Sequence, residues 1–352
     1  MLQRGQEKLR GTKRPHGAFI FGDMNTQAVM QQEKRRVAAL SVTSNGILVI
    51  LKMSIGLIIG SISVLSEAIH SAMDLIAAVI ALIAIRISGK EADEDHPFGH
   101  AKVESISAAI EALLIFAAAI WIIIAATHKL LSPQPLETVG WGVAVMCFSS
   151  IANLLISRML FSVGTKTESP ALIADAWHLR TDVYTSGGVM AGLGLIWIAG
   201  FIFPNANLNW IDPIAAILVA LLILKTAYQL TAHAVKDLID TSTPPEEKIW
   251  IEDYMKKLYP TVRSFHRLRT RKAGSNRFID FHMVVDEDMT VHESHDIAEQ
   301  ITKDFRMHFT NADITLHIEP CDGVCKYSCI SGCLLSENER KRVRQSKTKP
   351  TA

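Results

Sequence analysis

Six apolar runs, each long enough for a helix to cross a lipid bilayer, fill the chain between residues 37 and 232. A membrane-spanning helix needs about 20 mostly apolar residues, and a water-soluble fold would have to bury several such helices in one core. We place the spans at approximately 37–60, 61–87, 104–127, 138–162, 171–203 and 211–232. Only the short GSIS segment separates the first two spans, so we expect them to form a helical hairpin. The runs therefore predict an α-helical, multi-pass membrane domain.

Basic residues near the span ends set the expected orientation. Lys34, Arg35 and Arg36 precede the first span, and Arg158 and Lys166 lie toward the junction of the fourth and fifth spans. The GSIS and FPNANLNWID segments on the opposite side contain no Lys or Arg. Since cytoplasmic loops carry the excess of Lys and Arg, we expect both termini in the cytoplasm of a protein embedded in a cell or inner membrane.

Composition divides the chain into four parts. Residues 1–36 are polar and are expected to be a flexible cytoplasmic segment, and residues 37–235 form the six-helix transmembrane domain. Residues 236–320 read as helix, strand, strand, helix, strand, which is typical of a small ferredoxin-like α+β domain with its helices on one face of the sheet. A domain of roughly 80 residues buries little core by itself, so we expect it to form a homodimer. Residues 321–352 are a Cys-rich and basic tail.

Two stretches place a histidine and an aspartate four residues apart inside apolar runs. SEAIHSAMDL contains His70 and Asp74, and DAWHLRTDVYTS contains His178 and Asp182. Residues at i and i+4 share one face of a helix, so each stretch can turn one imidazole and one carboxylate toward a common point. Ionisable residues in a membrane span are costly and by default mark an ion path. Polar networks that only hold helices together are the alternative, but two copies of the pattern favour a metal site.

Two imidazoles and two carboxylates suit tetrahedral Zn²⁺, with Cd²⁺, Co²⁺, Fe²⁺ and Mn²⁺ as alternatives. Imidazole must be neutral to bind a metal, and its ordinary pKa of ~6.5 lies near physiological pH. Metal binding should therefore release protons, and protonation should release the metal. The pattern predicts that metal and protons compete for the same groups.

Three further charged residues lie close to these pairs or in the first span. Glu67 precedes His70 by three residues, and Asp175 precedes His178 by three. Either carboxylate is a candidate to orient the imidazole or to belong to a proton path. Lys52 is the lone charged residue of the first span, and we expect it to snorkel or to pair rather than to bind substrate.

The sequence resembles the cation diffusion facilitator family of divalent-metal exporters from about residue 37 to residue 320. The resemblance rests on GSISVLSEAIHSAMD, DEDHPFGHAKVES and ADAWHLRTDVYTS, followed by the α-β-β-α-β tail. It implies that the transport site consists of His70, Asp74, His178 and Asp182, a set that is usually linked with zinc in this family. It also implies a homodimer that exchanges cytoplasmic metal for protons by alternating access.

The loop DEDHPFGHAK after the second span offers Asp93, His96 and His100 on the expected cytoplasmic side. These three potential ligands flank a Pro-Phe-Gly turn and are able to close on one ion; a solvated acidic loop is the alternative. The resemblance implies a secondary metal site here in some members. It also matches Lys102 to a basic position that joins the two domains, with Asp240 as the implied acidic partner. A second acid that the family pattern places in the first span is absent from this sequence.

The resemblance implies a third metal site in the cytoplasmic domain, formed by His266, His282, His295, His317 and Glu319. His282 lies on the polar side of a predicted strand whose other side is apolar, and His317 and Glu319 share one strand face. Glu319 stands where some relatives have Asp, and its extra methylene is expected to loosen the site. Ordinary exposed histidines are the alternative. A metal ion that bridges two copies of the domain would tighten the dimer.

Four cysteines near the C-terminus, Cys321, Cys325, Cys329 and Cys333, are spaced uniformly four residues apart. This is not the C-x-x-C spacing of common zinc ribbons, and the glycines between them argue against a regular helix. In a reducing cytosol such thiolates can bind zinc, a softer ion or an iron–sulfur cluster. The sequence does not choose among these roles.

Together these patterns predict a proton-coupled exporter of divalent cations, with Zn²⁺ as the expected cargo and regulatory ligand. Its expected partners are divalent metal ions, protons, the lipid membrane and a second copy of the chain. The formal net charge of +1 gives no reason to expect nucleic acid. A membrane zinc metalloenzyme is the competing class, but H-E-x-x-H is absent and no nucleophile stands out. A metal sensor that does not transport would not need the four intramembrane ligands.

Overall fold

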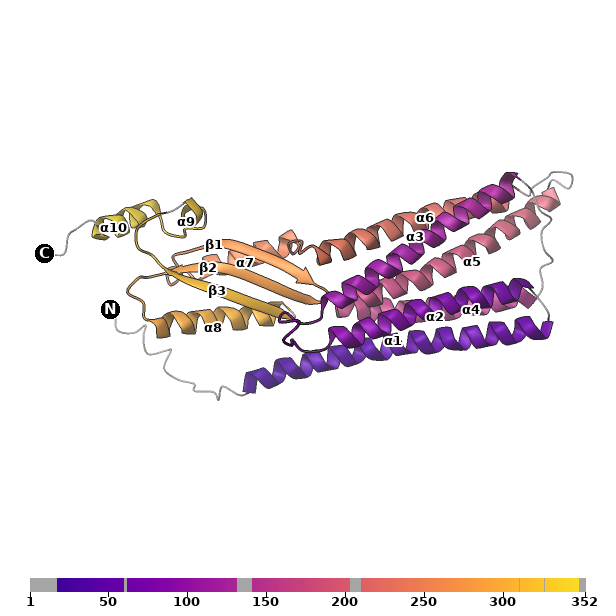
Figure 1. The fold of residues 1–352 in the computed structure, drawn as a ribbon. Coiled ribbons are helices and arrows are strands. Elements are labelled where there is room, and N and C mark those ends of the chain that lie inside the picture. The colour runs from indigo at the N-terminus through magenta and orange to yellow at the C-terminus, as the bar shows by residue number, and fades with distance from the viewer. Residues whose placement is uncertain are drawn as a thin grey trace.

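A computed structural model of the 352-residue chain describes residues 18–59, 62–131, 141–202, 210–309, 311–325 and 327–347. Six long helices form one end of the molecule (Figure 1): α1 (Ala18–Ile59), α2 (Ile62–Ser88), α3 (Lys102–Leu131), α4 (Trp141–Lys166), α5 (Pro170–Ile202) and α6 (Ile211–Leu238). Within these described ranges, five helices are long and apolar enough to cross a membrane. The GSIS and FPNANLNWID connections fall partly outside the described residues.

All six predicted spans are helical, but the first helix is longer than expected. Helix α1 begins at Ala18 rather than near residue 37. The prediction of a flexible segment over residues 1–36 is therefore wrong for residues 18–36, and residues 1–17 lie outside the described chain. The segment QAVMQQEKRR consists mostly of good helix formers and has no Gly or Pro. Lys34 also anchors it, because its Nζ lies 2.8 Å from Oε1 of Glu104 in α3.

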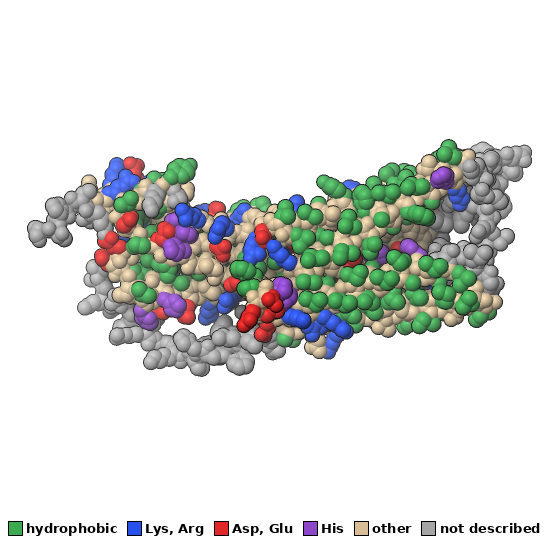
Figure 2. Space-filling model, viewed as in Figure 1, with side chains coloured by type: hydrophobic (Ala, Val, Ile, Leu, Met, Phe, Trp, Pro, Cys, Tyr) green, Lys and Arg blue, Asp and Glu red, His purple; other side chains and the backbone are tan. Residues whose placement is uncertain are grey.

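The six helices form two groups that meet along α5. Helix α1 packs on α2 and α4, α4 packs on α5, and α3 packs on α6; α5 also contacts α2, α3 and α6. Fully buried alanines such as Ala77 and Ala81 of α2 and Ala174 and Ala176 of α5 line the contacts, and such small residues let helices approach closely. Figure 2 shows apolar side chains over the outer surface of the helices on this face, which is the surface that lipid would contact.

The cytoplasmic domain consists of α7 (Pro245–Lys257), β1 (Ser264–Ala273), β2 (Asn276–Val285), α8 (Val291–His308) and β3 (Ala312–Pro320). Strand β1 pairs antiparallel with β2, and β2 pairs parallel with β3, giving the order β1-β2-β3. Phe281 and Met283 of β2 pack with Ile251 of α7 and Phe305 of α8 in the core. The predicted α-β-β-α-β order, with both helices on one face of the sheet, is confirmed.

Local sequence signals explain where these elements begin and turn. Thr290 and Glu293 form a capping box at the start of α8, and Pro245 occupies the first turn of α7. Gly274 makes the β1–β2 turn with φ +57°, and a Cβ at this position would lie 2.7 Å from the carbonyl oxygen of Ala101. The turn therefore needs glycine both for its backbone conformation and for its contact with the residue that precedes α3.

The C-terminal tail folds back on the start of β1. It forms α9 (Tyr327–Ser331) and α10 (Glu337–Lys347), which lie at the end of the molecule away from the long helices (Figure 1). The N–H of Phe265 donates to the carbonyl of Gly332 at 3.2 Å. A Cβ on Gly332 would lie 1.6 Å from the carbonyl oxygen of Phe265, so only glycine permits this approach.

Candidate metal-binding sites

The structure brings the two predicted His/Asp pairs together between α2 and α5. On α2, Nε2 of His70 lies 3.9 Å from Oδ1 of Asp74, one helical turn away. Between the helices, Nε2 of His70 lies 3.5 Å from Oδ1 of Asp182, and Nε2 of His178 lies 3.2 Å from Oδ1 of Asp74. Each histidine therefore contacts a carboxylate of the other helix.

These separations are close to those of a tetrahedral zinc site. Zinc bonds to nitrogen and oxygen of about 2.0–2.1 Å place neighbouring ligand atoms about 3.3 Å apart. The ligand atoms of His70, Asp74 and Asp182 lie within 4.8 Å of one another, and His178 joins them through its contact with Asp74. Three of the four groups are thus gathered, and His178 would have to approach His70 and Asp182 more closely to share one ion with them.

A polar cavity of about 140 Å³ opens beside the quartet formed by His70, Asp74, His178 and Asp182. Its lining includes Lys52 of α1, Asn153 of α4 and Thr185 of α5 as well as three of the four candidate ligands. One water occupies about 30 Å³ of liquid, so the cavity has room for an ion with several waters. The side chain of Asp74 is only 6% exposed and that of His70 is 53% exposed, so the ring of His70 marks the open side.

Two carboxyl groups are fully buried near His178. Asp175 lies on α5 and Glu111 on α3, and neither residue is exposed. Oε1 of Glu111 accepts a hydrogen bond from Ser107 at 3.2 Å, whereas Nδ1 of His178 and both carboxylate oxygens of Asp175 have no partner among the described residues. The predicted orienting contact between Asp175 and His178 is therefore not formed here. The sequence analysis did not identify Glu111, although a single acidic residue inside the apolar segment IEALLIF indicates a functional group in a membrane span.

The side chain of Glu67 lies outside the described residues.

The second group of predicted ligands is assembled in the loop between α2 and α3. Asp93, His96 and His100 present ligand atoms within 4.8 Å of one another. Oδ1 of Asp93 accepts the backbone N–H of His96 at 2.7 Å, and Oδ2 lies 3.3 Å from Nε2 of His100. This backbone hydrogen bond, together with the two nearby histidines, lowers the pKa of the Asp93 carboxyl. The loop therefore places two imidazoles beside a carboxylate that is ionised at neutral pH.

The third group crosses the sheet of the cytoplasmic domain. His266 of β1 pairs with His282 of β2, which pairs with His317 of β3, so the three imidazoles stand in one row across the strands. Glu319 closes this histidine row: its Oε1 lies 2.7 Å from Nδ1 of His282 and 3.7 Å from Nε2 of His317, and its Oε2 lies 3.3 Å from Nε2 of His266. The ligand atoms of His266, His282 and Glu319 gather within 4.8 Å.

The surroundings of the histidine row favour metal-competent protonation states. Burial lowers the pKa of His266, which keeps its imidazole neutral at neutral pH. Burial alone would raise the pKa of Glu319, but the hydrogen bond with His282 and the nearby histidines outweigh it, and the pKa is lowered. One carboxylate reaches both His266 and His282, and the expected loosening of a bound metal by the extra methylene of Glu319 stays a prediction.

His295 does not join this group, which corrects the predicted ligand set within one chain. It lies on α8, where its Nε2 is 3.6 Å from Oε1 of Glu299 on the same helix. Helix α8 packs on the apolar face of the sheet through Ile301 and Phe305. The histidine row lies on the opposite face, because His282 alternates with the core residues of β2. The sheet therefore separates His295 from the other predicted ligands.

The four tail cysteines are partly buried free thiols. In the described chain, none of the groups whose ligand atoms gather within 4.8 Å contains a cysteine. The tail therefore folds against β1 without a closed thiolate site among the described residues.

Ion pairs join the helical and cytoplasmic domains. Nζ of Lys102, at the start of α3, lies 2.9 Å from Oδ1 of Asp240, so the pairing implied by the family resemblance is confirmed. Arg271 of β1 lies 3.1 Å from the same carboxylate oxygen. One acid after α6 thus holds a membrane helix and a strand of the cytoplasmic sheet together.

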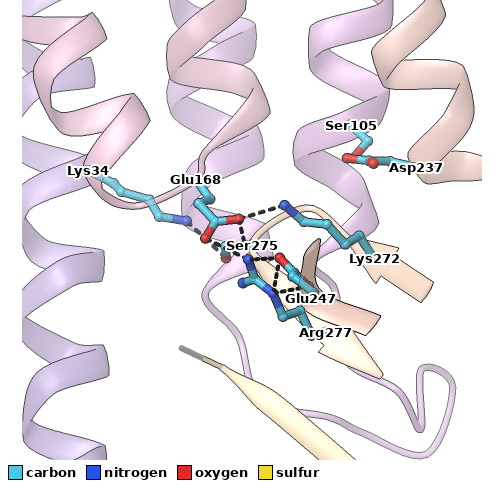
Figure 3. Close-up of polar contacts among 8 residues, drawn as sticks. All are labelled: Lys34, Ser105, Glu168, Asp237, Glu247, Lys272, Ser275 and Arg277. Carbon is cyan, nitrogen blue, oxygen red and sulfur yellow. Dashed lines mark hydrogen bonds and ion pairs between the residues drawn. The ribbon is translucent and has the colours of Figure 1, made fainter. Parts of the chain in front are cut away.

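A second polar network, which sequence reasoning did not find, surrounds Arg277 of β2. Arg277 lies 2.9 Å from Glu168 and 2.8 Å from Glu247 of α7, and Lys272 of β1 lies 2.5 Å from Glu168. Figure 3 shows Lys272 and Arg277 converging on Glu168 from the sheet. Glu168 lies two residues before the start of α5, so the cytoplasmic domain is tied to the helix that carries half of the intramembrane quartet. Glu168 is more than a hundred residues from Lys272 and Arg277, and Glu247 is 30 residues from Arg277, so no local sequence pattern predicts these contacts.

Two family models match the chain. The model of the cation efflux transmembrane domain matches residues 38–239, and the model of the cation efflux protein cytoplasmic domain matches residues 243–321. The chain is 35% identical over 272 residues to an uncharacterized transporter, sll1263, of Synechocystis sp., covering 77% of this chain and 86% of that protein. It is 33% identical over 292 residues to the cation-efflux pump FieF of Yersinia pestis, covering 83% and 94%. The solved metal-bound C-terminal domain of the CzcD transporter from Thermotoga maritima is 27% identical, covering 24% of this chain and 99% of that chain with a TM-score of 0.21.

Proposed function

Because this chain belongs to the cation diffusion facilitator family of divalent-cation efflux transporters, we propose that it exports Zn²⁺ from the cytoplasm in exchange for protons. It is an integral, multi-pass membrane protein with a cytoplasmic C-terminal domain, and it is a transporter rather than an enzyme. Divalent-cation efflux is the activity of the family. Zinc as the cargo, protons as the counter-ion and the residues that bind them are the proposed parts.

The assembly of the quartet beside a polar cavity carries the proposal. Asp74 and Asp182 supply two negative charges that balance one divalent ion, and His70 and His178 supply the imidazole ligands that Zn²⁺ favours. The contacts of 3.2 and 3.5 Å run between α2 and α5. A relative movement of these two helices would therefore alter the coordination of a bound ion, which is what alternating access requires.

Protons are the natural competitors at this site. An imidazole that carries a proton on its ligand nitrogen cannot bind metal, so loading from the cytoplasm displaces protons and protonation on the far side displaces the metal. After the metal is released, the protonated site carries a smaller net negative charge than two bare carboxylates would. In this state it reopens toward the cytoplasm. The smaller charge lowers the cost of moving an empty site through a low-dielectric region.

We further infer that the loop group and the histidine row bind cytoplasmic metal and regulate transport in a homodimer. The loop group contains Asp93, His96 and His100, and it lies where the β1–β2 turn meets the start of α3, since Phe98 packs edge-on against Phe278 of β2. Metal binding in the loop would therefore act close to the ion pairs that tie the sheet to the membrane helices, and metal binding at the histidine row would act on the same two strands, β1 and β2, that carry Arg271 and Arg277.

Flux through reconstituted proteoliposomes tests the proposal. With an imposed pH gradient, Zn²⁺ is expected to exchange for protons faster than Cd²⁺, Fe²⁺, Co²⁺ or Mn²⁺, each offered alone at equal concentration. Asp74→Ala should abolish the metal-driven proton flux while leaving the protein folded, because it removes the carboxylate that contacts both histidines. Equal flux by wild type and Asp74→Ala would contradict the assignment of the site, and a higher flux for another ion would replace zinc as the cargo.

A further inference from the structure

A lysine side chain lies inside the cavity of the intramembrane quartet. Lys52 of α1 is only 4% exposed and lines the same cavity as His70, Asp74 and Asp182. Its Nζ donates a hydrogen bond to Oγ of Ser71 at 2.8 Å, and Ser71 is adjacent to His70 on α2. The sequence expectation that Lys52 would pair is met, whereas snorkelling to the membrane surface is not, because the side chain points into the site.

A lysine in a cation site is costly unless it has a use. A buried ammonium group must be compensated by negative charge, and the cavity supplies it through Asp74 and Asp182. The same ammonium repels any divalent ion that enters between those carboxylates, because charges in a low-dielectric cavity interact strongly over several ångströms. Lys52 therefore opposes the loaded state and favours the empty one.

We propose that Lys52 is a resident counter-cation of the transport site. When the metal has left, its ammonium group offsets part of the charge of Asp74 and Asp182. When the metal is bound, its repulsion weakens the affinity enough for the ion to be released. This inference rests on the proposed function of the quartet as the cargo site, and it assigns to α1 a direct part in a site whose ligands all come from α2 and α5.

A purely structural role for Lys52 makes a different prediction. If the lysine only holds α1 against α2 through Ser71, then removing either partner should have the same effect. If its charge matters, then loss of the charge should tighten metal binding, whereas loss of the Ser71 hydroxyl alone should not. The comparison of Lys52 variants with Ser71→Ala separates the two roles.

Zinc affinity at the quartet provides the test. The full-length protein is titrated with Zn²⁺ at fixed pH against a chromophoric chelator, in a background where His100→Ala and His282→Ala weaken the other two candidate sites. Lys52→Met and Lys52→Gln are each expected to bind Zn²⁺ tighter by about tenfold or more, and to show a lower KM with a lower maximal flux. Lys52→Arg keeps the charge and should restore the weaker binding.

Two controls make the outcome decisive. Asp74→Ala in the same background should lose the quartet's zinc; if it does not, the proposed function fails, whatever the lysine variants show. If Asp74→Ala loses the zinc but both neutral Lys52 variants bind zinc no tighter than the background protein with Lys52, the proposed role of Lys52 as a counter-cation is overturned. Two neutral side chains of different shape are included so that poor folding of one variant does not decide the result.

Discussion

The intramembrane quartet and the histidine row of the cytoplasmic sheet use similar ligands on different scaffolds. Each site has buried and exposed members: Asp74 is 6% and His70 53% exposed, and His266 is 5% and His317 65% exposed. The quartet, however, lies between two membrane helices, whereas the row lies on one face of a sheet. The quartet contains two carboxylates and the row contains one. Ionisable groups at a sheet surface cost little to keep, but in a membrane they are expensive. This difference supports the proposal that the quartet transports the ion and that the row regulates transport.

The mechanical settings of the two sites differ as well. The quartet spans separate helices, α2 and α5, so a change in helix packing changes the ligand geometry. The row spans strands held in register by backbone hydrogen bonds, with His266 opposite His282 and His282 opposite His317. A rigid platform suits an ion that stays and signals, and a deformable site suits an ion that must leave. The predictions below test this division.

The largest effect is expected at the quartet. His178→Ala removes a ligand that is 12% exposed and should reduce metal-driven flux by at least about 100-fold, since even outer partners of metal ligands cost 10–100-fold when lost. His128→Ala, an exposed histidine in the last turn of α3, is the matched control and should transport like wild type. Flux is measured in proteoliposomes with a pH-sensitive dye. If His178→Ala and His128→Ala transport at comparable rates, the quartet is not the transport site and the proposed division between it and the histidine row fails.

A smaller effect is expected at the histidine row. His282→Ala removes the central imidazole and should shift the metal concentration that gives half-maximal flux, or loosen the dimer, while changing the maximal rate by less than about threefold. His292→Ala, which is exposed on α8, is the matched control for the loss of an imidazole from this domain. Complete loss of transport by a folded His282→Ala variant would reverse the ranking of the two sites.

The smallest effect concerns pH and the metal-free protein. Because burial lowers the pKa of His266 below its ordinary value of 6.5, the unfolded chain takes up this proton at a higher pH than the folded chain. The contribution of the neutral His266 side chain to the free energy of unfolding is therefore complete above about pH 6.5 and declines as the pH falls below it. His266→Gln should lose less thermal stability than wild type between pH 7 and pH 5, by a few degrees in Tm. Tm is measured as a function of pH for both proteins in the presence of a metal chelator. If the two Tm profiles are parallel, burial does not protect His266 from protonation.

Sequence reasoning recovered the six long helices and the α-β-β-α-β elements because their signals are local, but it predicted neither α9 nor α10. Apolar runs located all six long helices, and alternation in RFIDFHMVV placed Phe281 in the core and His282 on the opposite face. It misplaced the start of α1, because apolar length marks the membrane-crossing part of a helix and not its continuation into water. It also grouped His295 with the row because the family resemblance implied this residue, whereas within one chain His295 lies on α8, on the other side of the sheet.

The sequence alone determined that His70 and Asp74, and likewise His178 and Asp182, share a helix face, because a four-residue offset is a property of the helix itself. Only the tertiary structure decided that the two pairs meet, that Lys52 enters their cavity, and that Glu168 and Arg277 join the two domains. These contacts connect residues far apart in the chain, and they depend on how the helices pack. Local periodicity carries no information about that packing.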